Sequence, residues 1–328
     1  MTVFEMVLYF SCPSKSTLSF HRFPFALHAL FCYIILISPP YFKRLCERCK
    51  LVRKMNLQKE DYMDPACPLC GQPGETETVR PVPIGRIMDR LREYEDRNDW
   101  PAVERHLLYW LAEAEANRDR RGLLMLHNEL MGYYRKQGKK EPAYLHAKKA
   151  NELVRQLGME DTVTAGTTWV NSGTVMEAFR DSAAGLRYFE KARKNYEAGL
   201  PPEDGRLGGL YNNMGLCLAS CGRYGESREM FRKALRVMEK QPGGEPEQAI
   251  TWLNMADALE AELGPEEASE QAEEYLDRAA ALLDSPGIPR DGYYAFVCEK
   301  CAPVFGHYGY FLEEAELRKR AKEINERA

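Results

Sequence analysis

The fold is decided by one stretch of sequence, GLYNNMGLCLASCGRY at residues 209–224, which Phe231 and Ala234 follow. The apolar residues of this stretch predict one helix, with the small Gly215 midway, where a neighbouring helix must approach closely. Gly222 is placed to end that helix, because glycine tolerates the left-handed backbone that a helix stop often needs. The residues after it predict a second helix with one buried face.

The same order of residues recurs about every 42 positions along the chain. Gly222 has counterparts at Gly138, Gly264 and Gly306, and Arg180 occupies the remaining position of this series. Self-similarity at a period of 20–50 residues is the signature of a solenoid, in which similar units stack in a line. About six copies align, of which the earliest, at 91–110, is the most degenerate. The pattern therefore predicts six pairs of antiparallel helices.

Prolines gather where one predicted helix pair gives way to the next, as expected of residues that terminate helices. They are Pro201, Pro202, Pro242, Pro246, Pro286 and Pro289. No strand pattern stands out, and hydrophobic residues at 45% with charged residues at 29% are ordinary for a globular chain. The expected fold class is all-α.

The order aromatic residue, small residue, glycine, tyrosine, phenylalanine and alanine resembles the tetratricopeptide repeat, and residues 211–234 match it best. That repeat usually has about 34 residues, and the eight more found here would lengthen each helix by about a turn. Long copies with a paired asparagine before the small residue resemble the repeats of kinesin light chains and of bacterial peptide-pheromone receptors. The resemblance covers about residues 83–328. It implies a right-handed superhelical solenoid whose first helices line a concave groove that binds a protein or peptide.

If the first helices line a groove, the position next to the aromatic residue faces the partner. Asparagine recurs there, and its side chain offers both a hydrogen-bond donor and an acceptor. A ladder of asparagines would clamp an extended peptide backbone; the alternative is that these amides bond the adjacent helix and fix the stacking of repeats. The residues predicted to bind the partner are Asn128, Asn171, Asn212, Asn213, Asn254 and Arg135.

The first 54 residues do not follow the repeat pattern and are formally +6, which leaves about −10 for residues 55–328. The stretch 23–42 holds no charged residue, but its prolines leave only 25–38 free to be helical. That is short of the roughly 20 residues of a membrane-spanning helix, and no signal-peptide cleavage site follows. A weak membrane-associated segment remains one interpretation. Another is that translation begins at Met55 or Met63.

Six of the ten cysteines occur as Cys-x-x-Cys, in the pairs Cys46/Cys49, Cys67/Cys70 and Cys298/Cys301. The spacing of the first two pairs fits a four-cysteine zinc site, which would be closed and structural. The residues of this predicted site are Cys46, Cys49, Cys67 and Cys70. The alternatives are zinc held by the second and third pairs, or no metal, with the third pair buried as small apolar side chains. The expected organisation is an atypical segment at 1–54, a linker with a Cys-x-x-Cys knuckle at 55–82 and a repeat domain at 83–328.

Signatures of enzymes are missing from the sequence, which has no glycine-rich phosphate loop, His-Glu-x-x-His or Gly-x-Ser-x-Gly. The acidic repeat region does not favour a nucleic-acid partner, because phosphate binding needs clustered Lys and Arg. Unpaired thiols in number favour a reducing compartment, the cytoplasm. We therefore expect a non-enzymatic scaffold that binds a protein or peptide and not a membrane, with zinc as the one cofactor considered.

Two other functions stay open at this point. A regulatory peptide sensor like the pheromone receptors is disfavoured because no DNA-binding helix-turn-helix precedes the repeats. The other is an adaptor stabilised by zinc.

Overall fold

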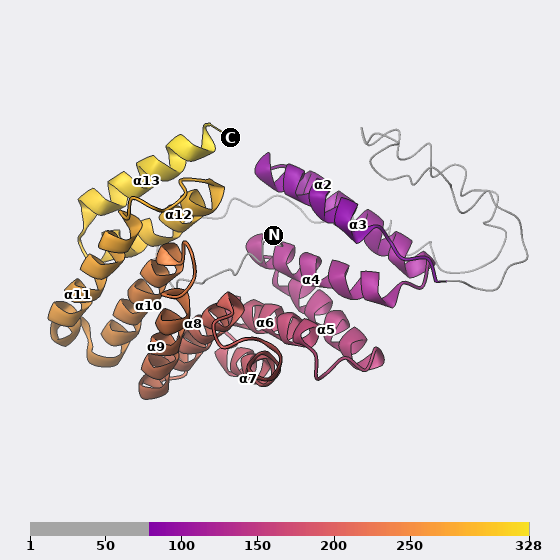
Figure 1. The fold of residues 1–328 in the computed structure, drawn as a ribbon, viewed down its shortest axis with the longest axis horizontal. Helices are drawn as coiled ribbons and strands as arrows, with labels where there is room; N and C mark the ends of the chain where they lie inside the picture. Colours follow the sequence, from indigo (N-terminus) through magenta and orange to yellow (C-terminus); the bar gives the residue numbers. More distant parts are fainter. Residues whose placement is uncertain (1–78, 328) are drawn as a thin grey trace, which may run out of the picture. The chain divides into compact units, whose positions relative to one another are not determined.

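The computed structural model describes residues 79–327, and the regular structure in this part of the chain is entirely α-helical. Its twelve helices are labelled α2 to α13 in Figure 1 and form six consecutive pairs. The first helices of the pairs are α2 (Ile84–Asp96), α4 (Arg120–Lys136), α6 (Val163–Ala178), α8 (Gly205–Ser220), α10 (Glu245–Leu263) and α12 (Gly292–His307). The second helices are α3 (Trp100–Ala116), α5 (Lys140–Gln156), α7 (Ser182–Gly199), α9 (Tyr224–Met238), α11 (Pro265–Leu283) and α13 (Phe311–Asn325).

Contacts between helices follow the order of the chain. Each first helix packs against the second helix of its own pair, and from α3 to α9 each second helix packs against the first helix that follows it. From α4 onward, each first helix also contacts the first helix of the next pair. Extensive contacts between neighbouring units are characteristic of a solenoid. The predicted all-α fold of six antiparallel helix pairs is therefore confirmed.

The turn inside each pair contains one residue with a left-handed backbone, at Asn98, Gly138, Arg180, Gly222, Gly264 and Gly309. Four of these positions are those expected from the period of the sequence. The expectation for Gly306 is wrong, because this residue lies inside α12 and the left-handed residue comes three positions later. The last pair therefore has a later turn than the regular spacing indicates.

Glycine in the middle of a first helix lets a phenylalanine of its second helix come unusually close. A Cβ atom placed on Gly215 would lie 2.5 Å from Cε1 of Phe231, and one on Gly173 would lie 2.7 Å from Cε1 of Phe189. Both rings are buried, at 0% and 1% exposed. This confirms the close approach expected at Gly215 and shows that the preceding pair uses the same contact.

Five of the six prolines predicted for the connections between pairs lie there, Pro242 between α9 and α10 among them; the prediction is wrong for Pro246, which is the second residue of α10. Pro201 and Pro202 lie between α7 and α8, and Pro286 and Pro289 lie between α11 and α12. Several helices begin at a side-chain cap, as where Asp119 accepts a hydrogen bond from the backbone N–H of Gly122 at 2.9 Å. Across residues 79–327, no helix is both long enough and apolar enough to cross a membrane.

Candidate partner-binding face

Asparagines of neighbouring first helices bond to each other in two pairs. The amide Nδ2 of Asn171 on α6 donates to Oδ1 of Asn128 on α4 at 3.0 Å. Two pairs of helices further on, Nδ2 of Asn254 on α10 donates to Oδ1 of Asn212 on α8, also at 3.0 Å. Because each bond joins two first helices, it fixes how consecutive repeats stack.

These bonds leave some of the amide groups unused. Asn128 is fully engaged, since its Nδ2 also donates to Leu124 O at 2.9 Å and to Thr168 Oγ1 at 3.1 Å. On α8 and α10, however, Nδ2 of Asn212, Nδ2 of Asn213 and Oδ1 of Asn254 are buried and have no hydrogen-bond partner among the described residues. Buried polar groups without a partner are rare in folded proteins, and each calls for an explanation. Here they amount to two donors and one acceptor on adjacent helices.

Between α6 and α8 a carboxylate takes the place of an asparagine pair. Glu177 accepts hydrogen bonds from Cys217 Sγ at 2.9 Å and from Ser220 Oγ at 3.1 Å. Burial, together with this carboxylate, raises the pKa of the Cys217 thiol well above its usual range. The thiol therefore stays protonated and acts as a hydrogen-bond donor in a helix contact.

Arg135, the remaining residue expected to bind a partner, is buried in the last turn of α4. The pKa of Lys300 on α12 is lowered first by burial and then by the charge of Arg135; Glu299 raises it, and Lys136 lowers it by less. Lys136 also forms an ion pair with Glu95 at 3.5 Å. Charged groups of the second and sixth pairs therefore act on each other, with Glu95 and Glu299 offsetting part of the positive charge.

The cysteines of the expected zinc site, Cys46, Cys49, Cys67 and Cys70, lie outside the described residues. Cys298 and Cys301 are both 0% exposed within the core around α10 to α13. Burial raises the pKa of both thiols, so they remain protonated. In the part of the chain from 79 to 327, no group of three or more His, Cys, Asp or Glu side chains is arranged to hold a metal ion.

A buried histidine pair joins the two helices of the second repeat. Nδ1 of His127 on α4 lies 2.8 Å from Nδ1 of His146 on α5, and Tyr134 stacks on the second ring. Burial lowers the pKa of His127 to about 3 and that of His146 to about 4. Both rings are therefore neutral near pH 7, as expected of packing residues. Spacing along the sequence gave no signal that these two would meet.

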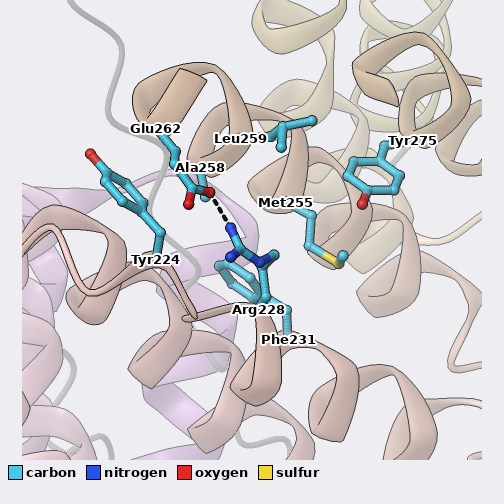
Figure 2. Close-up of a pocket in the computed structure, with 8 residues that line it drawn as sticks. All are labelled: Tyr224, Arg228, Phe231, Met255, Ala258, Leu259, Glu262 and Tyr275. Atoms are coloured by element: carbon cyan, nitrogen blue, oxygen red, sulfur yellow. Dashed lines mark hydrogen bonds and ion pairs between the residues drawn. The ribbon is translucent and has the colours of Figure 1, made fainter. Parts of the chain in front are cut away.

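A small cavity between α9, α10 and α11 is shown in Figure 2. Arg228 of α9 and Glu262 of α10 form an ion pair at its edge, and Tyr224 donates from its hydroxyl to Ala261 O at 3.0 Å. The cavity volume is about 10 Å³, which is room for about one water molecule. We interpret it as a packing seam between the fourth and fifth pairs and not as a ligand site.

Comparison with known proteins identifies the repeat. Residues 207–281 match the tetratricopeptide repeat family. The crystal structure of BtubC (BKLC) from P. vanneervenii is similar, with 19% sequence identity and a TM-score of 0.53 over 61% of this chain and 79% of that chain. Repeats described as TPR-like from a Podosopora anserina kinesin light chain show 14% identity and a TM-score of 0.44 over 61% of this chain and 94% of that one. None of the curated proteins matches the sequence.

The family match and the six stacked helix pairs agree. Residues 207–281 are tetratricopeptide repeats, and the six stacked helix pairs form a solenoid of the same kind. Repeats of this family generally mediate protein–protein interaction. Which residues make the contact, and with what, is decided by features of the individual chain.

Proposed function

We propose that this chain is a non-enzymatic scaffold that binds an extended segment of a partner protein along its first helices. The observation that carries the proposal is the set of unpartnered, buried amide atoms on α8 and α10, which are Nδ2 of Asn212, Nδ2 of Asn213 and Oδ1 of Asn254. An extended peptide backbone presents both carbonyl oxygens and N–H groups. Two amide donors and one acceptor match that alternation.

The asparagine pairs favour binding because they hold the amides in place beforehand. Oδ1 of Asn212 is fixed by its bond from Asn254 at 3.0 Å, so the free Nδ2 of the same side chain has a defined direction. Groups that are already ordered lose less conformational entropy when a partner binds. The three atoms lie below the surface, and a partner reaches them once the side chains over them change rotamer, as commonly happens at interfaces.

Contact through amides to a peptide backbone does not by itself select side chains. The ammonium group of Lys300 adds a preference, because its pKa is lowered chiefly by burial and a nearby carboxylate would favour its charged form. We therefore expect the bound segment to carry acidic residues at the end that lies beside α4 and α12.

The test is a selection from a random peptide library with the full chain as bait, followed by calorimetric titration of the selected peptides. We expect Asn213→Ala to weaken binding by about five- to tenfold, the worth of one hydrogen bond of about 1–1.5 kcal/mol. Because Asn213 makes no side-chain bond to another described residue, its replacement should leave the thermal unfolding midpoint almost unchanged.

Two controls accompany this variant. Glu190→Ala changes an exposed residue of the second helix α7 and should bind like the unmodified chain. Asn254→Ala removes a bond between repeats and should lower both stability and binding. Selected peptides that bind Asn213→Ala and the unmodified chain equally well would refute the assignment of the amides.

A further inference from the structure

A second hollow lies where the C-terminal end of α10 and the helix α11 meet the turn between α12 and α13. Its volume is about 210 Å³, below the roughly 300–1,000 Å³ of sites for small-molecule ligands. None of the asparagines discussed above lines it. A space of this size suits one large side chain of a partner protein.

Acidic and aromatic groups form the walls of this cavity. Glu260 of α10 and Glu273 of α11 contribute carboxylates, and His307, Tyr308 and Tyr310 contribute rings. The floor is apolar and consists of buried residues of α11, which are Ala268, Ala272 and Leu276. The cavity therefore combines an apolar floor with carboxylate groups on its walls.

Further carboxylates stand behind the two tyrosines. The hydroxyl of Tyr308 donates to Asp257 Oδ1 and that of Tyr310 donates to Asp277 Oδ1, each at 3.3 Å. Burial raises the pKa of Asp257 to about 7, although the charge of His307 and the hydrogen bond from Tyr308 act in the opposite direction. These hydrogen bonds also hold the tyrosine rings in fixed orientations.

Positive charge is scarce at this site. Among the described residues that line the cavity there is no lysine or arginine, and His307 is the single basic side chain. Its Nε2 lies 3.1 Å from one carboxylate oxygen of Glu260 and 3.2 Å from the other. Glu273 is exposed and forms no ion pair with another described residue. A carboxylate has about four lone-pair positions, so both glutamates retain capacity to accept hydrogen bonds.

Large apolar side chains are exposed next to the cavity. Phe311 and Leu312, the first residues of α13, are 68% and 83% exposed, and Leu263 at the end of α10 is 43% exposed. Tyr310, which lines the cavity, directly precedes them in the chain. Phe311 and Leu312 are adjacent in the chain, so together they offer apolar surface that a partner protein could cover.

We propose that this cavity binds an arginine side chain of a partner protein, while an apolar residue next to that arginine packs on Phe311 and Leu312. A guanidinium is planar and has five donors, so it matches a carboxylate through two hydrogen bonds and stacks on an aromatic ring. The ammonium of lysine makes neither planar contact. The site differs in place and in charge preference from the asparagine face and does not depend on it.

The experiment titrates the full chain with acetyl-leucyl-arginine amide and, separately, with its citrulline analogue, which has nearly the same shape but no charge. Binding is followed by NMR of labelled tyrosine and histidine rings. We expect the signals of Tyr308, Tyr310 and His307 to shift and saturate with the arginine peptide. The citrulline peptide should bind about tenfold more weakly or worse, because it lacks the charge-assisted hydrogen bonds.

A matched pair of variants locates the site. Glu273→Gln removes a lining carboxylate and should weaken the arginine peptide several-fold, whereas Glu270→Gln, on the same helix but outside the cavity, should not. Asn213→Ala should leave this binding unchanged, so that failure here is distinct from failure of the proposed scaffold function. Equal affinity for both peptides, or equal behaviour of the two glutamine variants, would overturn the proposal.

Discussion

The contact between Gly215 and Phe231 allows a sharp test of how these helix pairs pack. Adding one methyl group, as in Gly215→Ala, would place Cβ 2.5 Å from Cε1 of the ring. Carbon atoms pack at about 3.5–4.0 Å, so the ring or the helix has to move by about 1 Å. The ring is 0% exposed, and the cavity that it lines has a volume of only about 10 Å³, which leaves little room for the ring to move. Strain is therefore the expected result.

The magnitude follows from two opposing effects. Overpacking of a buried site costs about 1–3 kcal/mol, and the rigidity of this site favours the upper half of that range. Alanine is a better helix former than glycine by about 1 kcal/mol, which offsets part of the strain. We expect Gly215→Ala to be less stable than the unmodified chain by about 1–2 kcal/mol.

The assay is urea unfolding followed by circular dichroism, with Gly132→Ala as the control. Gly132 also lies within a first helix, but no atom comes within 4 Å of a Cβ placed there. This variant should gain up to about 1 kcal/mol from helix propensity alone. Replacing Phe231 by Leu in the Gly215→Ala background should recover part of the loss, since the smaller side chain leaves room for the methyl group. The reasoning is refuted if Gly215→Ala proves as stable as Gly132→Ala.

Three further outcomes are expected. Arg180→Gly should raise stability by about 0.5–1 kcal/mol in urea unfolding, because Arg180 has a φ of 63° that glycine adopts without strain. As the pH falls from 6.5 towards 4, His127 and His146 become protonated in the unfolded chain but stay neutral in the folded one. Their folded pKa values are about 3 and about 4. Stability should therefore fall by up to about 1.4 kcal/mol per pH unit for each ring, and the pH slope should be shallower in a His146→Gln variant. Folded Asp257, with a pKa of about 7, keeps its proton over a range in which the unfolded chain has lost it. The free energy of unfolding of the unmodified chain should therefore decrease as the pH rises from 4 to 7. At pH 8, Asp257→Asn should be more stable than the unmodified chain by about 1–3 kcal/mol. The same stability difference between the two chains at pH 4 and at pH 8 would contradict this.

Much of the fold could be predicted because the features that define it are local. The residue that ends a first helix, the small residue at its centre and the prolines between pairs each act within a few positions of the chain. The turn at Gly309 escaped prediction because the last pair departs from the period, and a glycine at the regular position, Gly306, lies within the helix. A periodic signal predicts the average repeat and not its exceptions.

Less of the candidate site than of the fold could be predicted from the sequence. The asparagines were recognised, but whether their amides bond the neighbouring helix depends on how two repeats stack, as the bond between Asn254 and Asn212 shows. The pairing of His127 with His146 crosses the turn of a helix pair and has no counterpart in the other repeats. The cavity beside Tyr308 and Tyr310 is formed by three helices and a turn, so no single stretch of sequence reveals it.

The matching glycine–phenylalanine contacts bear on how such a chain changes in evolution. In both the third and the fourth pair, the phenylalanine follows its glycine by the same interval, and Arg180 and Gly222 occupy equivalent turns. Excision of residues 181–222 would join α6 directly to α9 and bring Gly173 opposite Phe231. The joined helices would meet through the contact that each already makes with its present partner. Recombination at equivalent turns therefore offers a route by which helix pairs are lost or gained while the existing core contacts are kept.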